Sequence, residues 1–161
     1  MVSSYQLQPL TGSDHVVVRE IYADVITYES KSFYTKEQLQ SWSSLAWLPG
    51  VLDKSLIEGR GWISLQKQQV EAFAVRYPLN RLALLYCRSR ATRRGHATAL
   101  LNRVELEASE EGQTRLVTEA SLFSYPLLLK CGWIMIAPET IEIAGVSFEH
   151  YLMKKNLKNF D

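Results

Sequence analysis

The sequence predicts an α/β or α+β fold in which helices pack around one mixed sheet. Two observations support this fold class. Before residue 60, apolar residues recur at the spacing of amphipathic helices, whereas residues 61–87 alternate or run apolar in short blocks between polar turns, as strands do. From residue 88 onward, helical and strand patterns alternate to the end of the chain. This order is typical of a sheet that is covered by helices.

Three helices are expected before residue 60. The first covers residues 12–30, where apolar side chains recur at helical spacing after Asp14, a good N-cap residue type. The second begins at Thr35, which has capping-box spacing to Gln38. A third, shorter helix is expected within residues 50–59.

The rest of the chain predicts six strands and two helices. Gly112 and Gly132 are placed where helices should end, because glycine readily adopts the backbone conformation of a helix C-terminal cap. Ser121 is a good N-cap for the second of these helices. In order, the elements are strands at 61–66, 70–77 and 81–87, a helix to about 111, a strand at 115–120, a helix at 121–130, and strands at 133–143 and 146–155. With no repeat or linker between them, we expect a single domain over residues 1–161.

Composition narrows the class of partner. The chain has 161 residues, 47% hydrophobic, with 18 Lys and Arg against 17 Asp and Glu and a net charge of +1, so we expect no nucleic-acid partner. Cys87 and Cys131 have no metal-ligand spacing, and no metal is expected. The N-terminus lacks a signal-peptide pattern and no apolar run is long enough to span a membrane, so we expect no membrane association and a cytoplasmic location.

A basic segment, SRATRRGHATALL at residues 89–101, stands out against this near-neutral balance. A helix N-terminus exposes unpaired backbone N–H groups, which favour an anion. Gly95 removes the side chain that would keep a phosphate from the backbone, and Arg93 and Arg94 add positive charge. The alternative interpretation is a solvated basic first turn on an ordinary amphipathic helix.

The surroundings of this segment resemble a known family. The strand RLALLYC, the loop TRRGHA, the helix after it, and VTEAS followed by GW are similar to the acyl-CoA core of the GNAT superfamily of N-acetyltransferases. The ends of YTKEQLQSW and FEHYLMKK resemble its YafP-like branch. The resemblance implies a GNAT-like, mostly antiparallel twisted sheet with a central splay, flanked by helices.

The resemblance also implies a site for acetyl-CoA. In the family, the loop amides grip the pyrophosphate of coenzyme A, and Thr92 departs from the usual Gln or Arg at the first loop position. The splay would leave strand edges to bond the pantetheine arm. Ser121 could bond this arm from the other side, or serve only as a helix cap. The implied cofactor-binding residues are Tyr86, Cys87, Arg88, Thr92, Arg93, Arg94, Gly95, His96, Ala97, Thr98 and Ser121.

The catalytic groups are harder to assign, because the family's usual Tyr is replaced by Leu128. Tyr151 and His150 lie on the last strand, and His150 is expected to be structural or exposed. Two candidates are retained. Tyr125 lies one helical turn earlier and could protonate the departing thiolate, or be a packed aromatic residue. Glu119 ends its strand beside the expected cleft and could take a proton, or order a nearby loop.

The implied function is transfer of acetyl from acetyl-CoA to a primary amine, on a small molecule or a peptide, by direct attack. The resemblance leaves a homodimer open. Two other functions compete with this one: a catalytically weak acyl-CoA-binding module, suggested by the missing Tyr, and a polyanion-binding domain that uses the arginine cluster.

Overall fold

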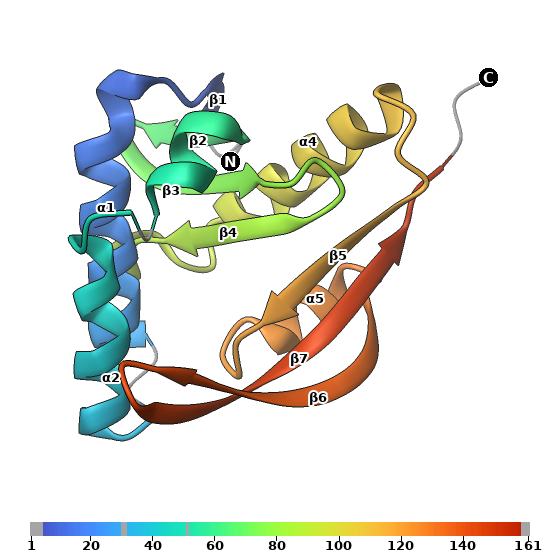
Figure 1. Cartoon of the computed structure of the whole chain (residues 1–161). Coiled ribbons are helices and arrows are strands. Elements are labelled where there is room, and N and C mark those ends of the chain that lie inside the picture. Colours follow the sequence, from blue (N-terminus) through green and yellow to red (C-terminus); the bar gives the residue numbers. More distant parts are fainter. Residues whose placement is uncertain (1–4, 30–31, 51, 159–161) are drawn as a thin grey trace.

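The computed structural model describes residues 5–29, 32–50 and 52–158, whose strands form two antiparallel sheets (Figure 1). The first sheet contains, in spatial order, β1 (Tyr5–Pro9), β2 (Arg60–Gln66), β3 (Gln69–Arg76) and β4 (Leu82–Cys87). The second contains β5 (Arg115–Ala120), β7 (Val146–Asn156) and β6 (Ile134–Ile143), with β7 in the middle.

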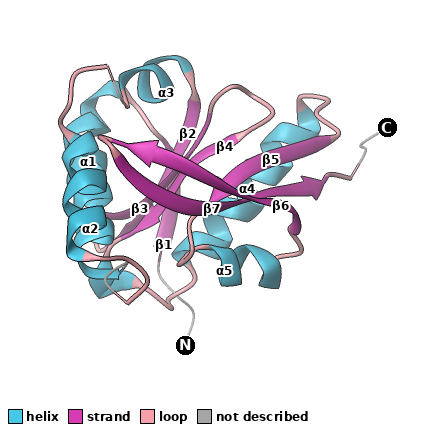
Figure 2. Cartoon of the chain, turned by 60° about the horizontal axis from the view of Figure 1, so that its bottom comes forward, coloured by secondary structure: helices cyan, strands magenta, loops and turns pink. Residues whose placement is uncertain are grey.

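The described residues form five α-helices around these sheets, and Figure 2 shows α1 and α2 on the same flank of the molecule. They are α1 (His15–Asp24), which continues as a π-helical turn over Val25–Glu29, α2 (Lys36–Ser43), α3 (Asp53–Glu58), α4 (His96–Glu110) and α5 (Tyr125–Lys130). Single 3₁₀ turns occupy Gly12–Asp14, Ser44–Ala46 and Ser89–Ala91. Among the described residues, no helix has the length and apolar character needed to cross a bilayer.

The two faces of β3 are covered by different helices, because successive side chains of a strand point to opposite faces. Phe73 and Val75 pack in the same cluster as the apolar side chains of α1 and α2. Ala72 and Ala74 pack instead against α4, whose Leu100 and other apolar residues complete a second cluster. Strand β3 is therefore buried on both faces.

The sheets meet along a seam between β4 and β5. A single parallel bridge joins Arg81 to Val117 at the start of these strands, and Thr118 Oγ1 donates a hydrogen bond of 2.7 Å to the Leu82 carbonyl. Beyond this point the strands diverge, so that β4 and β5 are each an edge strand of their own sheet. The predicted fold class with its central splay is therefore confirmed, and the splay separates the strands into two sheets that this bridge joins.

Most predicted elements are confirmed within a residue or two. The Thr35–Gln38 capping box is present, with Thr35 Oγ1 accepting from Gln38 N at 3.1 Å and Gln38 Oε1 accepting from Thr35 N at 2.9 Å. Gly112 and Gly132 have φ values of +89° and +90°, as expected of helix-ending glycines. The predicted end of the first helix, Ser30, lies outside the described residues, and so does Val51 of the 50–59 segment.

Two predictions are corrected. The first helix was expected to be the first element, but strand β1 precedes it and pairs with β2 from Tyr5↔Gln66 to Pro9↔Trp62. The helix expected at 121–130 begins only at Tyr125. Ser121 Oγ accepts from Ser124 N at 3.2 Å and closes a turn, and Pro126 then occupies the first helical turn, where its missing N–H costs nothing.

Candidate active site

The loop between β4 and α4 has an anion-binding geometry. Arg93 and Gly95 both lie in the left-handed region, with φ values of +64° and +92°. Left-handed residues interspersed in a loop turn neighbouring N–H groups toward a common side. The first helical bond runs from Ala99 N to Gly95 O at 3.0 Å, so the N–H groups of His96, Ala97 and Thr98 precede the helical ladder. The loop therefore presents backbone donors at the positive end of α4.

This loop borders a cavity of about 760 Å³, which we call the loop cavity. Its walls come from the loop, the end of β4 and helix α5. Of the predicted cofactor-binding residues, it is lined by Cys87, Thr92, Arg93, Gly95, His96, Ala97 and Thr98. The structure thus brings together residues from both sides of the loop glycine.

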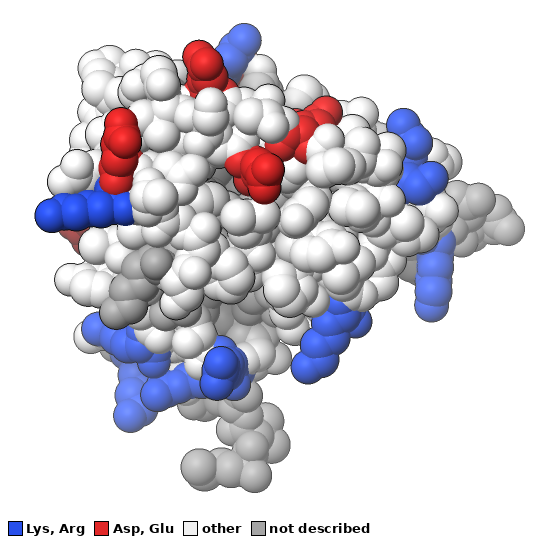
Figure 3. Space-filling view, turned by 90° about the horizontal axis from the view of Figure 1, so that it is seen from below, with Lys and Arg blue, Asp and Glu red and all other residues white. Residues whose placement is uncertain are grey.

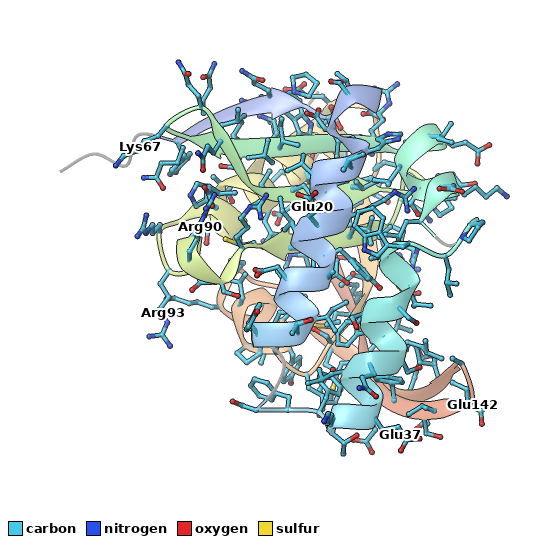
Figure 4. The ribbon with its side chains drawn as sticks, turned by 90° about the vertical axis from the view of Figure 1, so that its left-hand side faces the viewer. Glu20, Glu37, Lys67, Arg90, Arg93 and Glu142 are labelled. Atoms are coloured by element: carbon cyan, nitrogen blue, oxygen red, sulfur yellow. The ribbon has the colours of Figure 1, made fainter. Side chains whose placement is uncertain are left out.

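The arginines of this segment differ in role. Arg90 makes a two-pronged contact with the buried carboxylate of Glu71, through Nε at 2.9 Å and Nη2 at 2.7 Å, and so serves the fold. Arg93 lines the loop cavity. Figure 4 shows Arg90 and Arg93 at the same edge of the molecule, on the side away from Glu37 and Glu142. In Figure 3 the charged side chains in the lower half of the face are basic, and the acidic side chains lie in the upper half.

The His96 side chain anchors the loop to the sheet. Its ring is 1% exposed, with Nδ1 2.6 Å from Ser64 Oγ. Burial lowers the pKa of His96 below its ordinary value, so the ring is neutral near pH 7. This agrees with the interpretation of His96 as a backbone donor, since its ring faces β2 rather than an anion.

A second cavity, of about 410 Å³, lies at the seam, and we call it the aromatic cavity. Its walls come from both sheets and from α1 and α2, and they include the rings of Tyr22, Tyr34, Trp42, Tyr86, Phe123 and Phe148. Charged or titratable groups line it as well: Arg81, Glu119, Glu149 and His150. It is therefore an apolar chamber with a few polar groups, the usual composition of a small-molecule site.

The tyrosines of this cavity are neutral. Burial raises the pKa of Tyr22 and of Tyr86 well above the ordinary value, and for Tyr22 a hydrogen bond with Trp42 opposes the effect only in part. Burial also raises the pKa of Tyr34, whose hydroxyl oxygen accepts from Leu122 N at 2.8 Å. These hydroxyls can donate or accept hydrogen bonds, but they do not act as anions near pH 7.

The two cavities adjoin at the seam. Leu85 of β4, and Phe123 and Ser124 of the turn before α5, line both of them. Because β4 and β5 are edge strands there, an extended ligand can bond to an exposed backbone edge. The two cavities are therefore neighbours that share these side chains.

The other predicted site residues are spread around this junction. Tyr86, Glu119 and Ser121 line the aromatic cavity. Glu119 Oε2 accepts from Arg81 Nε at 2.7 Å, and Ser121 Oγ donates to Ser124 Oγ at 2.8 Å.

Three predicted residues line neither cavity. Arg88 donates to the carbonyl of Val70 at 3.0 Å, and Arg94 lies 3.5 Å from Gln66 Oε1. The ring of Tyr125 packs against that of Tyr151, with 4.4 Å between the centroids. These residues lie beside the cavities, and their roles stay predictions.

Several lining residues were not predicted, notably His150, Glu149 and Lys130. Lys130 is the last residue of α5 and lines the loop cavity. A cation is favoured at a helix C-terminus, so this position carried a usable signal. His150 had no local signal, because β7 contributes it from the end of the chain. Among the described residues, no group of three His, Cys, Asp or Glu side chains could hold a metal ion.

Comparisons with known proteins agree with this architecture. A structure described as a GCN5-related N-acetyltransferase from Rhodopseudomonas palustris has a TM-score of 0.92 at 24% identity, covering 98% of this chain and 99% of that one. PaiA N-acetyltransferase from Thermoplasma acidophilum, solved with coenzyme A, has a TM-score of 0.69 at 15% identity over 95% and 99%. YncA from Salmonella typhimurium, solved with its cofactor acetyl-CoA, has a TM-score of 0.65 at 15% identity over 98% and 96%.

These similarities establish the fold, and a family model identifies the lineage. No curated protein sequence matches the chain significantly. Residues 31–156 match the model of the acetyltransferase (GNAT) domain. That match spans most of the chain and includes the loop, the seam and most of the residues that line the two cavities. The protein therefore belongs to the GNAT family of acetyltransferases.

Proposed function

We propose that this protein transfers the acetyl group of acetyl-CoA to the primary amine of an acceptor molecule. The observation that carries the proposal is the junction of the two cavities at Leu85, Phe123 and Ser124. A thioester in the loop cavity and an amine in the aromatic cavity would meet there directly. No covalent enzyme intermediate is then needed, because the amine can attack the thioester carbon itself.

The loop cavity is the proposed acetyl-CoA site. Its backbone donors and Arg93 suit a pyrophosphate, and edge strand β4, which includes Tyr86 and Cys87, suits the amide groups of a pantetheine arm. Arg88, Arg94 and Ser121 complete the proposed set from the margins of the site. The coenzyme A and acetyl-CoA held by the structural neighbours from Thermoplasma and Salmonella support this assignment.

The aromatic cavity is the proposed acceptor site, and two residues are proposed for proton transfer. Tyr125 lies between Ser124 and Pro126, which both line the loop cavity, and would protonate the departing thiolate. Glu119 lines the aromatic cavity beside Arg81 and would hold the acceptor's ammonium or take its proton. The YafP-like branch, a single domain over residues 1–161, a cytoplasmic location and a homodimer are carried forward from the sequence as predictions.

Calorimetric titration with acetyl-CoA, followed by a thiol-release screen, tests the proposal. The screen covers small amines, aminoglycosides and peptide N-termini. We expect acetyl-CoA binding and thiol release with at least one amine. Binding without release from any amine would favour the acyl-CoA-binding module. RNA or DNA binding that outcompetes coenzyme A near physiological salt would instead favour the polyanion-binding domain.

A further inference from the structure

The aromatic cavity contains a histidine that the sequence pattern does not connect with catalysis. His150 lies on β7, its side chain is 12% exposed, and it lines the cavity together with Glu119 and Arg81. Glu119 is already paired with the Arg81 guanidinium at 2.7 Å, so its negative charge has a cationic partner. His150 instead faces a carboxylate, and this pairing suits a side chain that takes up a proton.

That carboxylate belongs to Glu139, which lies opposite His150 in the pairing of β6 with β7. His150 Nε2 and Glu139 Oε1 are 2.8 Å apart. A ring nitrogen that faces a carboxylate carries the proton and donates it, which leaves Nδ1 unprotonated. The same carboxylate stabilises the imidazolium that forms when Nδ1 takes up a proton. The pair therefore has the arrangement of an oriented base.

The strand register places His150 near the junction of the cavities. Phe148 and His150 are two residues apart on β7, so their side chains share one face of the sheet. Pairing of β5 with β7 ends at Ala120↔Tyr151, one residue before His150 is reached. His150 therefore lies level with the point where the chain leaves β5 and turns toward Ser124, which lines both cavities.

We infer that His150, oriented by Glu139, is the group that deprotonates the acceptor amine. This inference rests on the proposed function. A lysine-like amine has a pKa of about 10.4 and is mostly protonated near pH 7, so one N–H proton must leave before the nitrogen can attack. His150 Nδ1 takes this proton, directly or through one water molecule. The nitrogen lone pair then forms the C–N bond as the C–S bond breaks.

Protons and electrons balance in this scheme. The C–S electron pair leaves with the coenzyme A sulfur, which takes a proton from the Tyr125 hydroxyl, and the second proton of the attacking nitrogen restores that hydroxyl. His150 returns its own proton to solvent after turnover. The net reaction converts a thioester and an ammonium ion into an amide, a thiol and one free proton, and it needs no oxidant or further reactant.

The test is the pH dependence of kcat/KM in the parent and in His150→Gln, with an amine found active in the screen. Glutamine keeps a polar side chain at this position but cannot take up a proton. We expect the variant to lose about 10²-fold in kcat/KM at pH 7.5. A general base accelerates the reaction only in its unprotonated form, so the ratio of parent to variant should fall as the pH is lowered.

Other groups near His150 require matched variants. Glu139 faces it from β6, Glu119 lies on β5, Arg81 precedes β4, and Glu149 is its neighbour on β7. Glu139→Gln should lower kcat/KM, because the His150 ring loses the carboxylate that orients it. Glu142→Gln is the control, because Glu142 lies on β6 like Glu139 but lines neither cavity. Glu119→Gln tests the rival carboxylate.

The outcomes separate this inference from the proposed function. Acetyl-CoA affinity and thermal unfolding should match the parent in each variant, and added imidazole should restore part of the activity of His150→Ala. A parent-to-variant ratio that does not change with pH, or activity of His150→Gln within twofold of the parent, would overturn the role of His150 alone. Acetyl-CoA binding with no turnover of any amine by the parent would overturn both.

Discussion

Gly95 is the position at which a single side chain should separate phosphate binding from folding. Its φ of +92° is unfavourable for any L-residue, by about 1–2 kcal/mol. A Cβ there would meet Tyr5 Cε1 at 3.7 Å, an ordinary van der Waals contact, so the backbone strain is the main cost. Gly95→Ala, Gly95→Gln and Gly95→Glu should therefore all lower the Tm by a similar roughly 2–8 °C.

Binding should distinguish the three variants. A carboxylate about 4 Å from one phosphate charge costs about 4 kcal/mol at the effective dielectric of a protein surface, and its side chain can relieve part of that by turning away. We expect Gly95→Glu to bind acetyl-CoA about 10²–10³-fold more weakly than the parent. Gly95→Gln has the same bulk and strain without the charge and should lose far less.

Calorimetric titration with acetyl-CoA and thermal unfolding by circular dichroism measure the two effects separately. If Gly95→Glu binds as tightly as Gly95→Gln, no phosphate lies at this loop. If it binds as tightly as the parent, the loop is not the cofactor site at all. A Tm far below that of Gly95→Ala would mean that the charge disturbs the fold, and the affinity loss would then have another cause.

Three further substitutions test the catalytic, packing and electrostatic arguments. Tyr125→Phe keeps the ring that packs on Tyr151 and removes only the hydroxyl, so turnover should fall about 10²-fold with acetyl-CoA affinity unchanged; turnover within twofold of the parent would make Tyr125 a packing residue. Gly59→Ala should lower the free energy of unfolding, measured with urea, by about 1–3 kcal/mol or more, because its Cβ would lie 2.6 Å from the Arg76 carbonyl oxygen, a backbone atom with little freedom to move. Gly12→Ala, whose Cβ would meet open space, should lower it much less. Burial lowers the pKa of His96 in the folded state, so only the unfolded chain takes up its proton just below about pH 6.5, and the free energy of unfolding should decline there as pH falls. His96→Gln should reduce this decline in urea titrations across pH 5–8, and an unchanged slope would contradict the assignment.

The sequence was most informative where structure is set by neighbouring residues. The Thr35–Gln38 capping box and the helix-ending Gly112 are both local features, and both are present. The loop before α4 is also local, since its glycine and first-turn amides lie within a few residues of one another. By contrast, β1 is short and pairs with a strand more than fifty residues away, so its own five residues gave no sufficient signal.

The aromatic cavity could not be predicted for the same reason. Alternation along β7 indicates that Phe148 and His150 share a face, but not which helices and strands lie opposite that face. Tyr34 and Trp42 reach the cavity from the N-terminal region, and Glu119 reaches it from β5. Only the assembled fold shows that these side chains surround one space.

The seam between β4 and β5 also bears on how the protein holds together. Strands β1 to β4 come from residues 5–87 and strands β5 to β7 from residues 115–156, so each sheet is built from its own stretch of chain. Between the strands themselves, few bonds cross from one sheet to the other. A ligand that spans the seam binds only when both sheets are folded, and at a hundred times its Kd such binding stabilises a protein by about 2.7 kcal/mol. The acyl donor would thus act as a structural crosslink as well as a reactant, and amide protons along the facing edges of β4 and β5 should be those whose exchange it slows most.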